Sequence, residues 1–198
     1  MACISNLVKN IGLNCEAAIG GASAVYLLPF EKFDKTKTIT ALNDPVNTIK
    51  NKLILPTLEA KTAQDLWVRI DCPNGVVNAT SNVTKNEVNR TSSFVQTAIF
   101  NLYFNEMSSI TTDVEFKSFL DSLSNGKFIA VVRLASGKGL VIGFDNGCVV
   151  TSQALATGVA GADLAGSVIT LTASNEFSNP YFVIPDFFEE NKFVADTI

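Results

Sequence analysis

Residues 128–152 read FIAVVRLASGKGLVIGFDNGCVVTS, and they give the clearest indication of the fold class. Three apolar runs rich in β-branched residues are separated by two short segments that contain glycine. The runs are residues 128–135, 140–144 and 148–152. Runs of this kind, bounded by tight-turn residues, are typical of antiparallel strands joined by hairpins. The stretch therefore predicts a β-meander with turns at 136–139 and 145–147.

Other parts of the chain carry the same strand pattern. The further predicted strands are residues 24–28, 52–58, 66–71, 76–83, 94–104 and 167–174. Because Asn74-Gly75 is a strong tight-turn dipeptide, the strands on either side of it are expected to form a hairpin. One face of strand 94–104 is apolar apart from Gln96, and its other face is mixed. Both faces carry enough apolar surface to be covered in an assembled protein.

A single amphipathic helix is predicted after residue 112. Thr112 and Glu115 have the spacing of a capping box, and apolar residues then recur at i, i+3, i+4 and i+7. This apolar stripe comprises Phe116, Phe119, Leu120 and Leu123. The segment Ser124-Asn125-Gly126 is expected to end the helix.

Together these elements predict an α+β fold that is mainly β. The expected architecture is an antiparallel β-sandwich or half-barrel of about eight to ten strands with one flanking α-helix. No internal repeat or composition boundary divides the chain, so residues 1–198 are expected to form one domain.

Residues 33–51 differ from the rest because they are charged, rich in threonine and broken by Asn43-Asp44-Pro45. They are expected to form a hairpin or extended arm that lies outside the sandwich and contacts a neighbouring subunit. A disordered or self-packed hairpin is the alternative. The candidate contact residues are Lys35, Lys37, Thr38, Thr40 and Asp44.

The C-terminal tail, residues 175–198, is rich in aromatic residues. It could fold back over its own domain, which is the simpler interpretation, or dock on a partner subunit. The candidate contact residues are Tyr181, Phe182, Phe187 and Phe188.

Charge and composition disfavour several classes of function. The chain has 15 Lys and Arg against 19 Asp and Glu, a formal net charge of -4, so it lacks the basic surface of a nucleic-acid reader. It has no histidine, the commonest general base and metal ligand. We therefore expect a protein that is not an enzyme, with no catalytic, cofactor-binding or metal-binding residues.

The expected cellular compartment follows from the N-terminus and the cysteines. The first residues lack the pattern of a signal peptide, and no apolar run approaches the ~18 residues that cross a bilayer, so synthesis in the cytoplasm without membrane contact is expected. The cysteines are widely spaced and are expected to be reduced thiols. They are Cys3, Cys15, Cys72 and Cys148.

Several short motifs resemble those of virion proteins of tailed phages and prophages of Bacteroidota, including the crAss-like group. The similar segments are residues 1–5 (MACIS), 13–15 (LNC), 19–27 (IGGASAVYL), 126–132 (GKFIAVV) and 166–172 (GSVITLT), with Glu176 and Pro180-Tyr181-Phe182 after them. The similarity covers both ends and the final third of the chain and is weakest over residues 33–95.

The resemblance implies a tail-tube-like structural protein of the virion tail or neck. Such a subunit would assemble with itself into a ring, with a hexamer favoured and a dodecamer as the alternative, and contact neighbouring tail, neck or portal proteins. DNA would pass through the ring without sequence recognition. A mildly acidic channel would repel the passing phosphates. The family has no catalytic residue to carry over.

Two other functions compete with this interpretation. A carbohydrate- or receptor-binding β-sandwich module of a virion or cell surface could use Trp67 and surface aromatic residues. A small-molecule barrel or enzyme is disfavoured by the missing histidine.

Overall fold

The computed structural model describes residues 21–43, 54–55, 58–72, 77–86, 91–103, 113–156 and 166–188. The strands are β1 (Ala22–Pro29), β2 (Ile54–Leu55), β3 (Val68–Asp71), β4 (Asn78–Asn86), β5 (Thr91–Tyr103), β6 (Lys127–Leu134), β7 (Gly139–Ile142), β8 (Cys148–Ala156), β9 (Gly166–Glu176) and β10 (Phe182–Val183). The helices are α1 (Lys35–Asn43) and α2 (Asp113–Asn125), with short 3-10 turns η1 (Phe30–Lys32) and η4 (Pro185–Phe188). The predicted α+β, mainly β class is confirmed.

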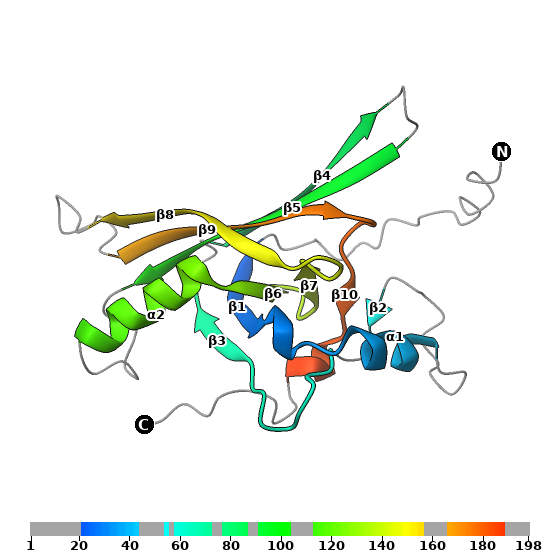
Figure 1. Ribbon diagram of the computed structural model, residues 1–198, viewed down its shortest axis with the longest axis horizontal. Helices are drawn as coiled ribbons and strands as arrows, with labels where there is room; N and C mark the ends of the chain where they lie inside the picture. Colours follow the sequence, from blue (N-terminus) through cyan, green and yellow to red (C-terminus); the bar gives the residue numbers. More distant parts are fainter. Residues whose placement is uncertain are drawn as a thin grey trace.

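All ten strands belong to one hydrogen-bonded sheet (Figure 1). Its main path runs β2-β10-β7-β6-β8-β9-β5-β4, and β1 pairs with the other edge of β6 and with β3. Every pairing is antiparallel except that of β10 with β2.

The sheet folds back on itself, because strands that are not hydrogen-bonded neighbours share one apolar core. Val25 of β1 and Val132 of β6 lie in the same buried cluster as Phe100 of β5 and Leu171 of β9. In Figure 1, β5, β8 and β9 pass across β1 and β6. This cluster also takes in Leu120 and Leu123 of α2, so the predicted helix and its apolar stripe are confirmed at these positions.

A second buried cluster lies on the opposite face of β1, β6 and β7. It contains Tyr26 and Val131 from the strands, together with Trp67 and Phe187 from segments that cover them. Strands β1 and β6 are therefore buried on both faces, which explains their nearly continuous run of apolar residues.

The predicted meander is half correct. The β6 and β7 hairpin forms with its turn at 135–138, where Gly137 has a positive φ of 83°. The second hairpin is wrong, because β7 has β6 on one side and β10 on the other and no edge remains for β8. Strand β8 pairs with β9 instead and meets β6 only at Lys127 and Phe128.

The predicted hairpin across Asn74-Gly75 is also wrong. Strand β3 pairs with β1, whereas β4 pairs with β5 over nine residues. Residues 73–76, which hold the turn dipeptide, lie outside the described residues. The longer ladder available on β5 explains why β4 pairs there.

The arm predicted at 33–51 requires a correction. Residues Lys35–Asn43 form helix α1 instead of a hairpin, and Phe33 and Thr38 are buried against the body. The described residues thus hold two α-helices where one was expected. Asp44 and the rest of the predicted arm lie outside the described residues.

Candidate functional site

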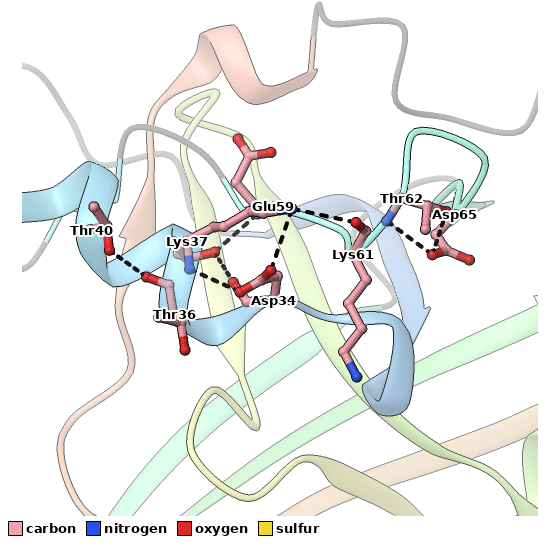
Figure 2. A network of polar contacts seen from close by, with 9 residues as sticks. Asp34, Thr36, Lys37, Thr40, Glu59, Lys61, Thr62 and Asp65 are labelled. Carbon is pink, nitrogen blue, oxygen red and sulfur yellow. Dashed lines mark hydrogen bonds and ion pairs between the residues drawn. The ribbon is translucent and has the colours of Figure 1, made fainter.

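Helix α1 is attached to the segment 59–65 by polar contacts (Figure 2). The carboxylate of Asp34 accepts the N–H of Lys37 at 2.9 Å, so Asp34 is the N-cap of the helix. The hydroxyl of Thr38, which is fully buried, donates to the carbonyl of Asp34 at 2.9 Å and accepts the N–H of Glu59 at 3.0 Å. Thr38 is therefore an internal residue in this structure.

The other predicted contact residues of α1 also have partners within the chain. The ammonium group of Lys37 lies 3.5 Å from Asp34 and 3.4 Å from the carbonyl of Lys61. The hydroxyl of Thr40 donates to the carbonyl of Thr36 at 2.8 Å. Both side chains remain exposed on the helix.

Lys35 connects α1 to the loop that follows β7. Its Nζ lies 2.7 Å from Oδ1 of Asp145 and 5.5 Å from the ring centroid of Phe144. The other carboxylate oxygen of Asp145 accepts the N–H of Phe177 at 3.2 Å. Three segments that are distant in sequence therefore meet at Asp145.

Glu176 holds the same loop from inside the protein. The residue is 1% exposed, and its carboxylate accepts the N–H groups of Asp145 at 2.8 Å and Asn146 at 2.9 Å. Burial raises the pKa of Glu176, whereas the two backbone hydrogen bonds oppose that rise. The carboxylate thus satisfies two loop N–H groups at an electrostatic cost.

Gln96 is a second buried polar support of this region. Its side-chain oxygen accepts the N–H of Gly143 at 3.1 Å, and its Nε2 donates to the carbonyl of Ser178 at 3.3 Å. Sequence reasoning noticed a polar residue on an apolar face but did not predict these contacts. A single amide side chain on an otherwise apolar strand face indicates such contacts, because a buried amide needs hydrogen-bond partners.

From Tyr181 to Phe188, the aromatic tail packs on its own domain. The fully buried ring of Phe187 lies 5.4 Å from that of Trp67 in an edge-on arrangement. Phe188 lies 5.0 Å from Tyr26, and Tyr181 lies 4.6 Å from Phe144. Phe182 is half-buried in β10, where it pairs with Leu140 of β7.

The structure agrees with the simpler interpretation of the tail for residues 181–188, whereas Phe177 is exposed. The predicted contact of Phe187 with a partner subunit is wrong, because its side chain is fully buried. Trp67 is fully buried as well, so it is not the surface aromatic that a glycan site would use.

The outer face of β8, β9, β5 and β4 is left uncovered by described residues. The register places hydroxyl, amide and small apolar side chains in cross-strand rows on this face. One row is Val149, Thr172, Thr97 and Thr80. The only charged residues in these four strands are Glu176, which is buried, and Lys85 near the end of β4. Within these four strands the face carries no charge, and Lys127 of β6 lies beside Val149 at its corner.

An open hollow lies at one corner of this face. Its lining includes Lys127, Asn146, Val149, Thr172, Ser174 and Phe177. Phe177 is 76% exposed, and Val149 is 42% exposed. Hydroxyl groups and an exposed ring thus lie side by side here.

The cysteines that the structure describes agree with the prediction of reduced thiols. Cys72 and Cys148 are buried, and each Sγ lies within hydrogen-bond distance of a backbone carbonyl. Burial raises the pKa of the Cys148 thiol to about 12. Cys3 and Cys15 lie outside the described residues.

The described part of the chain holds neither a metal-binding cluster nor a membrane-spanning helix. Within it, no group of three or more His, Cys, Asp or Glu residues could hold a metal ion. No helix in the same ranges is long and apolar enough to cross a membrane.

Comparisons with family models, curated proteins and solved structures found no match to this chain.

Proposed function

We propose that this chain is a structural subunit of a bacteriophage tail or neck, which assembles into rings that form a channel for DNA during ejection. The uncharged outer face of β8, β9, β5 and β4 is the observation that carries this proposal. It supports the function that the sequence motifs imply. The subunit would then reside in the virion, after synthesis in the host cytoplasm.

A solvent-facing sheet normally carries charged side chains among its polar ones. Charged side chains on the solvent face of a strand discourage association. Here Ile99 and Val149 are exposed among threonine and asparagine side chains. Such a surface suits contact with other subunits.

The same composition suits a channel wall. Lysine and arginine side chains bind DNA phosphates and hold them, whereas hydroxyl and amide groups do not neutralise phosphate charge. A net charge of -4 adds weak repulsion. DNA could then pass without recognition of its sequence.

Negative-stain electron microscopy of the purified protein is the test. Closed rings, with a hexamer favoured and a dodecamer as the alternative, would support the proposal. A compact monomer at micromolar concentration, with no larger assembly in virions, would contradict it.

A carbohydrate- or receptor-binding module is the second candidate, and the hollow at Phe177 is the observation that favours it. An exposed ring beside hydroxyl groups is suited to stacking on a sugar. Glycan binding that is lost in Phe177→Ala, by a protein that forms no rings, would favour this function.

A further inference from the structure

The free edge of β4 is a long strand edge without a partner in the part of the chain that the structure describes. Strand β4 pairs with β5 on one side from Asn78 to Asn86. In Figure 1 the β4 and β5 ribbon extends well beyond the other strands. Side chains 80–85 are all exposed. The second edge of β4 therefore presents unpaired backbone groups along its length.

This edge lacks the features that keep other edges of the sheet from pairing. It has no proline, its register with β5 contains no bulge, and Lys85 is its only charged residue. By contrast, β2 is only two residues long, and β3 is four residues long with an ion pair of Arg69 and Asp71 at 2.7 Å. Among the described edges, β4 is the one best suited to add a strand.

The alternate residues of β4 on one face read the same in either direction, whereas Ala79 and Ser81 do not match Lys85 and Val83. The strand reads NATSNVTKN, with Asn82 at the centre. Asn78 mirrors Asn86, and Thr80 mirrors Thr84. A two-fold axis through Asn82 would place each of these side chains opposite its own kind.

We propose that β4 pairs antiparallel with β4 of a second copy of this chain, about a two-fold axis that passes through Asn82. Nine residues paired in this way form about eight to ten backbone hydrogen bonds, which matches the number in a typical protein interface. The Thr80 and Thr84 hydroxyls of the two copies then lie in cross-strand pairs, which stabilise antiparallel sheets.

Charge is compatible with this register. Lys85 of one copy lies opposite Ala79 of the other, so no like charges face each other. The two Lys85 residues are six positions apart along the strand, about 20 Å, which exceeds the ~8 Å screening length in physiological salt. A pairing shifted toward the C-terminal end of β4 would bring the two lysines together, so charge also favours the register centred on Asn82.

The contact goes beyond the proposed ring. An isologous contact closes on itself and yields a dimer, whereas ring formation needs a different, heterologous contact. If rings form as well, β4 pairing would join two of them back to back. The uncharged outer faces of two subunits would become one continuous sheet surface.

Disulfide cross-linking tests the register directly. In a background with Cys3→Ser and Cys15→Ser, Asn82→Cys is expected to form a covalent dimer under mild oxidation, because residues opposite each other have Cα atoms about 4.5 to 5.5 Å apart. Thr80→Cys alone is the matched control and should not cross-link, since its two copies would lie about 14 Å apart. Mixing Thr80→Cys with Thr84→Cys should restore the cross-link.

Sedimentation velocity provides a second measurement. Asn82→Lys places two ammonium groups opposite each other and should weaken the dimer at least about tenfold, whereas Ser118→Lys on exposed α2 should not. A wild-type monomer across the micromolar range, or equal cross-linking of Asn82→Cys and Thr80→Cys, overturns the proposal. Rings without the Asn82 cross-link would overturn β4 pairing and leave the ring proposal intact. Cross-linked dimers without rings would support β4 pairing and contradict the ring proposal.

Discussion

The ammonium group of Lys35 lies 2.7 Å from a carboxylate oxygen of Asp145, and the two residues are 110 positions apart in the chain. This ion pair joins the first turn of α1 to the loop after β7. Because Lys35 is 37% exposed and Asp145 is 11% exposed, the pair lies at the boundary between solvent and core. Its position shows that α1 belongs to the body of the protein.

We expect this ion pair to contribute modestly to stability. In a double-mutant cycle with Lys35→Met and Asp145→Asn, the coupling free energy should be at most about 1 kcal/mol and should fall as salt is added. Urea unfolding of the four proteins measures it. A coupling well above about 2 kcal/mol that ignores salt would contradict this expectation.

Glu176 should make stability depend on pH. Its folded-state pKa is raised above the ordinary value of 4.5, so the folded protein holds this proton to higher pH than the unfolded chain does. The free energy of unfolding contributed by this group is therefore highest below pH 4.5 and falls as the pH rises through the raised pKa. The stability difference between wild type and Glu176→Gln should shrink or reverse from pH 4.5 to 7. A stability difference that stays constant or grows over this pH range would contradict the assignment of the pH dependence to Glu176.

Phe187→Ala should destabilise the protein more than substitutions on the exposed face of β8, β9, β5 and β4. The ring is fully buried against Trp67, so its loss should lower the free energy of unfolding by about 3 to 5 kcal/mol. The chain has one tryptophan, so a red shift of its fluorescence would report the opened contact directly. Phe177→Ala is the matched control, and it should change stability by less than about 0.5 kcal/mol.

Thr38 lies on the buried face of α1, whereas Thr40 lies on its exposed face. Thr38→Val leaves the N–H of Glu59 without its acceptor and should lower the free energy of unfolding by about 1 to 3 kcal/mol. Thr40→Val should be nearly neutral.

Deleting residues 36–48 should also destabilise the domain, whereas a projecting arm could be removed without loss of stability. Thermal unfolding distinguishes these outcomes.

All four cysteines should titrate as thiols after denaturation without reductant. In the folded protein Cys148 should react very slowly, because it is buried and its pKa is raised to about 12. A titration that finds fewer than four groups would show that the compartment was inferred wrongly.

Local patterns predicted the elements that form between neighbours in sequence. The β6 and β7 hairpin follows from two apolar runs around Gly137, and α2 follows from a helical apolar stripe with stop residues after it. The buried face of β5 follows from alternation along one strand. Each depends on residues within about a dozen positions, so a local window of sequence is enough to predict it.

The pairing of strands that are distant in sequence depends on the whole fold. Strand β8 joins β9 because both edges of β7 are occupied, and β4 joins the long strand β5 rather than β3. Helix α1 has a threonine-rich sequence with little intrinsic helix propensity, and its cap at Asp34 and the burial of Thr38 against segment 59–65 stabilise it. In each case the deciding free energy comes from edges and apolar surfaces contributed by distant parts of the chain, which no local window of sequence contains.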